Sequence, residues 1–238
     1  MLVERGLAAS RARARALIQK SVVFADEDLV TKAGAMVPEN TALKLNEDDH
    51  PWVSRGALKL VHGIAHFGLD ATERTCLDIG ASTGGFTEVL LVKGAAKVFA
   101  VDVGTNQLHE TLRLNPRVVL LEQTDARTLT RDLITEAPML IVCDASFIGL
   151  AKVLARPLSL AAPGATLIAL IKPQFEVGPE NVGKGGVVRD ETVRRRACDD
   201  VVEWLGTEQG WTVLSLTESP ITGQAGNVEY LVAARAPA

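Results

Sequence analysis

The sequence is poor in cysteine and has no long apolar run. Its three cysteines, Cys76, Cys143 and Cys198, are odd in number and lie far apart among apolar neighbours, which favours reduced thiols over a disulfide framework or a zinc site. The longest stretch without a charged residue, 157–171, is interrupted by proline and glycine and is shorter than the roughly 20 apolar residues that cross a bilayer. Residues 1–7 contain charged side chains where a signal peptide needs an apolar core. We therefore expect a cytoplasmic globular protein without membrane contact, metal or cysteine chemistry.

The chain also lacks an excess of positive charge, but its charges are unevenly distributed. The net charge is −4, yet residues 1–46 hold seven lysines and arginines against five acidic residues, a net +2 that leaves −6 for the remainder. This distribution is typical of a small anion-binding module attached to an acidic body, and a solvated helix face would explain it equally well. The candidate phosphate contacts are Arg11, Arg13, Arg15 and Lys20.

Residues 1–46 have the pattern of a small α+β domain. Ser10 is a suitable N-cap for a helix over 11–19. The apolar run 22–24 and the alternating run 43–45 predict short strands. Because fewer than about 50 residues bury little apolar surface, we expect this region to depend on its neighbour for stability.

The polar, acidic segment 47–53 predicts a linker, and a second domain follows over 54–238. That domain opens with a helix expected over 55–67 and then alternates between short apolar strands and helix-length segments, which indicates a parallel sheet covered on both faces. The last two strands, 211–216 and 229–234, are joined by a loop too short for a helical crossover and should be antiparallel. We therefore expect an α/β fold with a Rossmann-like, mostly parallel sheet and an antiparallel last strand. The earlier strands are expected at 75–79, 98–103, 118–122, 139–144 and 166–171.

The most specific local motif is the glycine-rich segment 77–87 (LDIGASTGGFT), which leaves the first strand of that sheet and enters a helix. Such a turn binds a nucleotide-like ligand. Ser82 stands where a dinucleotide fingerprint needs its second glycine, and Asp78 would repel a phosphate but attract an ammonium or sulfonium group. The segment therefore favours S-adenosylmethionine over NAD. Its candidate cofactor contacts are Asp78, Gly80, Ser82, Gly84, Gly85 and Phe86.

Two further aspartates and two phenylalanines are candidate ligand contacts. Asp102, at the end of the second strand, is placed to hydrogen-bond ribose hydroxyls, and we expect both it and Asp78 to contact the ligand and not the core. Asp125, after the third strand, could accept a hydrogen bond from an adenine amino group, and a turn-capping role fits its position equally well. Phe147 and Phe175 could stack on the cofactor or on a target base, with buried packing as the alternative.

Charged residues converge at one edge of the predicted sheet. Asp144 ends the fourth strand and Lys172 ends the fifth, while Glu229 begins the antiparallel last strand and so lies where the others end. Lys59 on the preceding helix could complete the group, although it belongs to a polar row with Arg55 that is typical of a solvated face. A structural salt bridge is the alternative interpretation of these charges.

The chain contains five motifs that together are distinctive: SRGALKL (54–60), the glycine-rich segment 77–87, DASFI (144–148), KPQFEVG (172–178) and GNVEY (226–230). In combination they resemble the haemolysin A (TlyA) family of bacterial rRNA 2′-O-methyltransferases with an FtsJ-like catalytic domain, and the resemblance covers nearly the whole chain. It implies methyl transfer from S-adenosylmethionine to a ribose 2′-hydroxyl, of cytidine, in ribosomal RNA within ribosomal subunits. It also implies a catalytic Lys-Asp-Lys-Glu tetrad of Lys59, Asp144, Lys172 and Glu229.

The resemblance further implies that residues 1–46 form an alpha-L, ribosomal S-four-type RNA-binding domain. Such proteins commonly begin earlier with an Arg-Leu-Asp-like strand, whereas this chain starts inside the first helix, so the completeness of that domain stays open. In the implied reaction Lys172 removes or holds the proton of the hydroxyl, and Asp144 and Glu229 position the lysines. Two other classes remain: a Rossmann-type oxidoreductase, which the missing second glycine disfavours, and an RNA-binding ribosome-associated factor with a catalytically weak methyltransferase domain.

Overall fold

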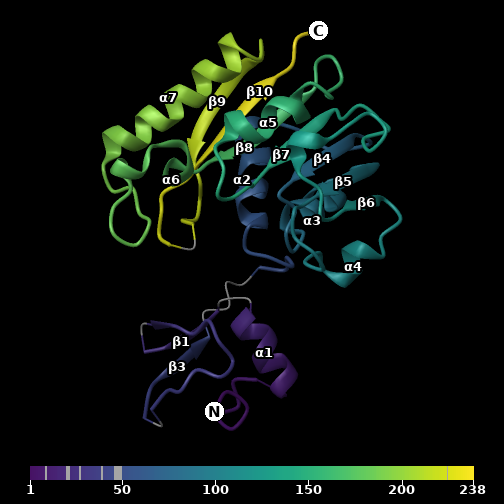
Figure 1. The fold of residues 1–238 in the computed structure, drawn as a ribbon. Coiled ribbons are helices and arrows are strands. Elements are labelled where there is room, and N and C mark those ends of the chain that lie inside the picture. The colour runs from purple at the N-terminus through teal and green to yellow at the C-terminus, as the bar shows by residue number, and fades with distance from the viewer. Residues whose placement is uncertain (9, 20–21, 27, 39, 46–49, 224) are drawn as a thin grey trace. The chain divides into compact units, whose positions relative to one another are not determined.

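The chain forms two compact units, which are described separately. The computed structural model describes residues 1–8, 10–19, 22–26, 28–38, 40–45, 50–223 and 225–238, and in the first helix it leaves out the side chains of residues 12, 13, 16 and 19. The units are Met1–Pro51 and Trp52–Ala238 (Figure 1). The division between them falls inside the segment 47–53, which the sequence predicts as a linker.

The first unit packs one helix against a small antiparallel sheet. Helix α1 spans Arg11–Gln19, and strand β1 (Val23–Ala25) pairs with both β2 (Asp28–Leu29) and β3 (Leu43–Leu45). Its small apolar core is formed by Leu2, Ala8, Leu17, Ile18 and Val23. The α+β organisation expected for this region is therefore confirmed.

The second unit is built around a larger, mostly parallel sheet. Its strands are β4 (Thr75–Ile79), β5 (Lys97–Val101), β6 (Val118–Leu121), β7 (Leu140–Cys143), β8 (Thr166–Ile171), β9 (Thr212–Glu218) and β10 (Tyr230–Arg235). They lie in the order β6-β5-β4-β7-β8-β10-β9, and β10 runs antiparallel to both of its neighbours. The chain adds strands on one side of β4 and then crosses to the other side, which makes the carboxyl ends of β4 and β7 the place where α/β sheets bind ligands. The predicted sheet, including its antiparallel last strand, is confirmed.

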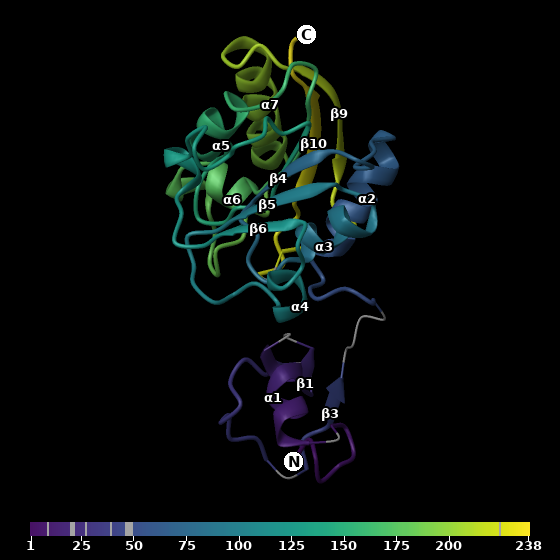
Figure 2. The ribbon, with the colours of Figure 1, turned by 90° about the vertical axis from the view of Figure 1, so that its right-hand side faces the viewer.

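Helices cover both faces of this sheet (Figure 2). They are α2 (Ala57–Phe67), α3 (Gly85–Val92), α4 (Glu110–Arg113), α5 (Leu150–Leu158), α6 (Pro173–Glu176) and α7 (Glu191–Thr207), with short 3-10 turns η1 (Ala126–Thr128) and η2 (Pro179–Asn181). Figure 2 shows α2 and α3 on one face and α5, α6 and α7 on the other. Within the described residues, no helix is both long and apolar enough to span a membrane.

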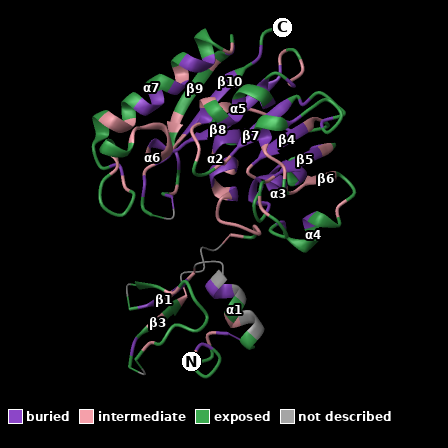
Figure 3. Ribbon diagram, in the orientation of Figure 1, coloured by how far each residue is buried: buried purple, intermediate pink, exposed green. Residues whose placement is uncertain are grey.

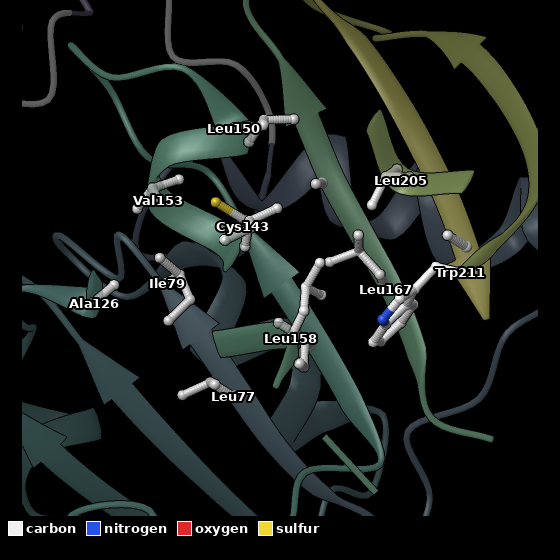
Figure 4. Packing of buried hydrophobic residues seen from close by; sticks show 14 of the residues in the cluster. Leu77, Ile79, Ala126, Cys143, Leu150, Val153, Leu158, Leu167, Leu205 and Trp211 are labelled. Carbon is white, nitrogen blue, oxygen red and sulfur yellow. The ribbon is translucent and has the colours of Figure 1, made fainter. Parts of the chain in front are cut away.

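The central strands are buried on both faces (Figure 3), because their side chains are apolar at successive positions and not at alternate ones. The second unit has two clusters of buried apolar side chains. In one of them, Ile79, Cys143 and Leu167 of the strands pack with Leu150 and Leu158 of α5 (Figure 4). Each such leucine or isoleucine contributes roughly 1.5–3 kcal/mol by its burial. These layers hold the strand ends, and hence the residues that follow them, in fixed positions.

The three cysteines are free and buried among apolar side chains, Cys143 and Cys198 in this cluster and Cys76 in the other. Burial raises the pKa of the Cys76, Cys143 and Cys198 thiols to about 12, so the nucleophilic thiolate is scarce near neutral pH. Their role is packing.

Candidate functional site

The four charged residues predicted to converge do meet at the carboxyl edge of the larger sheet. Asp144 follows β7 directly, and Lys172 follows β8. The antiparallel pairing of Tyr230 with Ile171 places Glu229 and Lys172 at the same edge. Lys59 reaches this edge from α2, which begins at Ala57 and not at position 55 as expected from the sequence.

The four side chains form a chain of alternating charge. Lys59 Nζ lies 2.6 Å from Glu229 Oε2 and 3.7 Å from Asp144 Oδ2. Lys172 Nζ lies 2.6 Å from Asp144 Oδ1, and its hydrogen bonds are directed at Ser146 Oγ (2.8 Å) and at the Asp144 carbonyl (3.2 Å). Asp144 therefore links the two lysines through separate carboxylate oxygens.

These charges are largely removed from water. Only 7% of Lys59, 6% of Lys172 and 3% of Glu229 is exposed, so the expectation of a solvated helix row is wrong for Lys59. Breaking a buried ion pair by removing one partner costs about 3–5 kcal/mol. Three of the four charges are buried and Asp144 is half-buried, so their mutual compensation fixes each ammonium group in direction, which is a property that proton handling requires.

The segment that carries Glu229 is held in place by backbone hydrogen bonds. Ser219 N donates to Glu229 O at 2.9 Å. The buried Asn227 side chain accepts from Val188 N at 2.9 Å and donates to Gly186 O at 2.8 Å. The loop before α7 and the loop before β10 are thereby joined, which keeps Glu229 facing Lys59.

The glycine-rich turn has the backbone that its sequence predicts. Gly80 (φ +81°) and Gly84 (φ +99°) adopt conformations that favour glycine. A Cβ at position 84 would lie 2.3 Å from Leu112 Cδ1, and one at position 80 would lie 3.0 Å from both N and Cα of Ala145. The turn therefore touches the loop that follows Asp144, so that the candidate cofactor turn and the tetrad are adjacent. Gly85 and the buried Phe86 begin α3.

Asp102 joins two loops of this edge. Its carboxylate accepts hydrogen bonds from Ser82 N at 2.8 Å and from Gly104 N at 2.7 Å. The side chain is half-buried, and two hydrogen bonds leave part of the carboxylate's acceptor capacity for a ligand.

Among the described residues of the second unit, four of the five non-glycine residues with a positive φ lie along the same edge, and the fifth, Glu73, precedes β4. Ser82, Asn106, Gln123 and Phe147 follow β4, β5, β6 and β7 respectively, and their φ angles lie between +47° and +66°. A positive φ at a residue other than glycine costs about 1–3 kcal/mol and is concentrated at functional sites. This distribution supports the carboxyl edge of the sheet as the functional site of this unit.

Asp78 is more deeply buried than the sequence suggests. It has no exposed surface, and Thr87 Oγ1 donates to its Oδ2 at 2.7 Å, so the expectation that it avoids the core is wrong. Burial raises its pKa to about 7, which the Thr87 hydrogen bond partly opposes. Its Oδ1 has no hydrogen-bond partner in the described part of the chain. A buried carboxylate oxygen without a partner needs a donor, and a cationic group would satisfy it.

Asp125 is engaged within its own turn. It caps η1 by accepting from Arg127 N at 2.9 Å, and both of its oxygens contact the Arg127 guanidinium. These hydrogen bonds hold the pKa of the Asp125 carboxyl below its ordinary value. The turn-capping interpretation is thus realised, while the adenine contact stays a prediction.

Phe147 does not pack in the core. It is 90% exposed, and its ring centroid lies 5.2 Å from that of Phe175. The buried-packing alternative is therefore wrong for Phe147, whose exposed ring contacts only the Phe175 ring among the ring pairs described.

The arginines proposed for RNA contact lie on α1 of the first unit. Arg11 and Arg15 are exposed, and their spacing of four places them on one helix face. The side chain of Arg13 and the whole of Lys20 lie outside the described residues. Within the part that is described, no three His, Cys, Asp or Glu side chains gather as a metal site would require.

Several residues of this edge escape the sequence analysis. Glu122 Oε1 accepts from Gln107 N and pairs with Arg113, both at 3.1 Å, and backbone N–H groups hold the pKa of Glu122 below its ordinary value. Glu176 Oε1 accepts from Leu150 N at 2.9 Å and so caps α5. Both carboxylates accept hydrogen bonds from backbone N–H groups. Such contacts leave no periodic pattern in the sequence. Ser146 also escaped, although it lies inside the DASFI motif.

Comparisons with known proteins agree with this geometry. Residues 52–236 match the model of the FtsJ-like methyltransferase family. The chain belongs to this family. A protein of Mycobacterium tuberculosis named 16S/23S rRNA (cytidine-2′-O)-methyltransferase TlyA is 47% identical over 97% of this chain and 86% of its own length.

Solved structures give the same result for the fold. A structure from Streptococcus thermophilus that carries the name hemolysin is 36% identical, covers 99% of this chain and 86% of its own, and superposes with a TM-score of 0.79. The N-methyltransferase NodS of Bradyrhizobium japonicum, in complex with S-adenosyl-L-homocysteine, shares the fold alone, with 18% identity over 80% of this chain and 90% of its own and a TM-score of 0.55. This FtsJ-like enzyme thus has the fold of S-adenosylmethionine-dependent methyltransferases, and its membership of the FtsJ-like methyltransferase family removes the oxidoreductase alternative.

Proposed function

We propose that this FtsJ-like methyltransferase transfers a methyl group from S-adenosylmethionine to the 2′-hydroxyl of a cytidine ribose in ribosomal RNA. The observation that carries the proposal is the largely buried Glu229–Lys59–Asp144–Lys172 chain of ion pairs beside the glycine-rich turn. The printed name of the Mycobacterium tuberculosis relative supports the substrate. The Streptococcus thermophilus structure carries the name hemolysin. Among the described residues of this chain, no helix is long and apolar enough to span a membrane.

The residues at the carboxyl edge suit S-adenosylmethionine. The unpartnered Asp78 Oδ1 matches a cationic group, and the carboxylate of Asp102 beside Ser82 N matches ribose hydroxyls. When bound, the cofactor supplies an electrophilic methyl group on a sulfonium. Because the Asp78 carboxylate would repel a phosphate group, its position disfavours a dinucleotide.

Within the tetrad, Lys172 handles the proton of the target hydroxyl. Its Nζ is directed by Asp144 and Ser146, so it either takes the 2′-hydroxyl proton as the neutral amine, becoming the ammonium, or as the ammonium donates a hydrogen bond that holds the hydroxyl oxygen. Lys59 and Glu229 compensate one another and keep the Asp144 carboxylate oriented toward Lys172.

The decisive experiment is incubation of separated ribosomal subunits with the protein and methyl-labelled S-adenosylmethionine. Mapping of 2′-O-methylated nucleotides should show label at a cytidine ribose of one or both subunits. Label on a base, or tight binding to subunits without transfer, would contradict the proposed reaction, and the second result would favour an RNA-binding factor with a weak methyltransferase domain.

The affinity for S-adenosylmethionine should rise with pH through about 7, because Asp78 has a pKa near 7 and only its carboxylate attracts a cation. Between pH 6 and pH 8 we expect about a 10-fold gain, measured by calorimetry. The matched Asp78→Asn variant should bind weakly with little pH dependence, while Asp132→Asn, at an exposed position, should behave as the wild type. An unchanged affinity in Asp78→Asn would remove Asp78 from the cofactor site.

The same carboxyl should affect stability in the opposite sense. Because its pKa is raised from 3.8 to about 7 on folding, the neutral form of Asp78 contributes stability below about pH 4, and this contribution is lost as the pH rises through 7. A bound cation would compensate the charge that forms above pH 7.

We further propose that the unit Met1–Pro51 binds ribosomal RNA through phosphate contacts. Replacing Arg11 and Arg15 together by alanine should weaken subunit binding and reduce its salt slope by about 2, since each arginine neutralises one phosphate. Filter binding over a salt series would measure this, and the affinity for S-adenosylmethionine should not change. Arg131→Ala, at an exposed position of the other unit, is the control, and an equal effect there would argue against a specific RNA contact.

A further inference from the structure

Ser146 contacts the tetrad but has no role in the scheme above. Its Oγ accepts a hydrogen bond from Lys172 Nζ at 2.8 Å. Ser146 is exposed, whereas only 6% of Lys172 is. The serine hydroxyl therefore lies on the side of the buried lysine that faces solvent, which is the side from which a target hydroxyl must approach.

The contacts of Lys172 show what this hydroxyl does. An ammonium group has three N–H donors, and two of them are hydrogen-bonded, to Ser146 Oγ at 2.8 Å and to the Asp144 carbonyl at 3.2 Å. Asp144 Oδ1, 2.6 Å away, is the ion-pair partner of the ammonium group. Ser146 therefore fixes the direction of one N–H, and one N–H remains for the target hydroxyl.

The loop that carries Ser146 is fixed at both ends. At its start, Asp144 N donates to Ile79 O at 3.0 Å. At its end, Leu150 N donates to Glu176 Oε1 at 2.9 Å, and Glu176 belongs to α6, the helix that begins immediately after Lys172. Between these ties, Phe147 adopts a φ of +66°. Strain of this kind persists only where the surrounding structure imposes it, so the position of Ser146 Oγ is defined by the fold.

We propose that Ser146 is a positioning residue of the methyltransferase: its hydroxyl holds the ammonium group of Lys172 in the direction in which it meets the target hydroxyl. The proposal rests on the proposed function of Lys172. A proton-handling group displaced by about 1 Å can lose up to 100-fold in rate. Loss of one of its two hydrogen bonds, with the other and the ion pair to Asp144 retained, is expected to have a smaller effect.

The test compares three variants on ribosomal subunits under single-turnover conditions. Ser146→Ala should lower kcat about 10-fold, while the KM for subunits and the affinity for S-adenosylmethionine change less than about 2-fold, since no binding contact is lost. Ser146→Thr keeps the hydroxyl and should recover most of the rate. Ser215→Ala removes an exposed hydroxyl from β9 and should have no effect. A normal kcat in Ser146→Ala, or a rise in KM alone, would overturn the proposal.

A double-mutant cycle separates positioning from an independent contribution. If Ser146 acts through Lys172, then Ser146→Ala should produce no further loss in a Lys172→Ala background. A further loss of about 10-fold in that background would refute the role. Absence of 2′-O-methyl product from the wild-type protein would instead refute the proposed function, so the two failures are distinguishable.

Discussion

Lys172→Ala should reduce the rate of methyl transfer by about 100-fold or more, the loss typical for a positioned acid–base group. The Lys172 ammonium group is directed by Asp144 and Ser146 at the edge where the target hydroxyl is expected. The alanine variant therefore lacks the group expected to act on the reacting 2′-oxygen, while the glycine-rich turn stays intact. Single-turnover rates at saturating S-adenosylmethionine should fall, and the affinities for cofactor and ribosomal subunits should stay near those of the wild type.

Lys172→Arg should be nearly as inactive as the alanine variant. Arginine keeps the charge but cannot be deprotonated in a protein, and its planar fork does not match a site built for a compact ammonium. Lys93→Ala, at an exposed position at the end of α3, is the matched control. Rescue by arginine alone would change the role of Lys172 from proton handling to charge stabilisation, and near wild-type turnover in Lys172→Ala would remove the residue from the mechanism.

Glu229→Gln should be the most destabilising change in the tetrad, with a loss of roughly 3 kcal/mol in the free energy of unfolding. Glu229 lies 2.6 Å from Lys59, and both side chains are buried. Glutamine leaves the lysine charge without its nearest partner, and the remaining contact to Asp144 Oδ2 is 3.7 Å long. Methyl transfer should fall as well, because Lys59 would then compete with Lys172 for Asp144.

A compensated variant separates these two effects. Lys59→Met combined with Glu229→Gln removes both charges of the pair and should recover most of the stability, since the Asp144–Lys172 pair stays balanced. Its methyl transfer should remain low. Urea unfolding and single-turnover rates would measure the two quantities on the same samples. A double variant as unstable as Glu229→Gln would show that this buried pair does not act as a unit.

The convergence of Asp144, Lys172 and Glu229 could be predicted because topology alone determines it. Short apolar strands separated by helix-length segments require a parallel sheet, and the short loop before β10 requires an antiparallel last strand. From these rules, Asp144, Lys172 and Glu229 have to meet at one edge. The glycine turn was equally accessible, because its positive φ angles at Gly80 and Gly84 demand the residue type seen.

Other features of the site depend on tertiary packing and left no periodic signal. Lys59 belongs to a polar row that normally faces water, yet the packing of α2 beside β8 and β10 buries it. Asp78 was expected to contact the ligand and not the core, but its hydrogen bond to Thr87 lies in the core. Buried packing was the alternative to stacking for Phe147, whose ring is exposed on a strained backbone. In these cases packing and backbone geometry override the local sequence pattern.

The closeness of Gly80 to Ala145 has a consequence for how this enzyme can vary. A side chain of even one carbon at position 80 would press on the backbone between Asp144 and Ser146, the two residues that direct Lys172. The turn proposed to bind the cofactor and the loop that directs the Lys172 ammonium group are therefore in direct contact. Substitutions of Gly80 that change the preference for the methyl donor should therefore also change the rate of methyl transfer, and neither property should change alone.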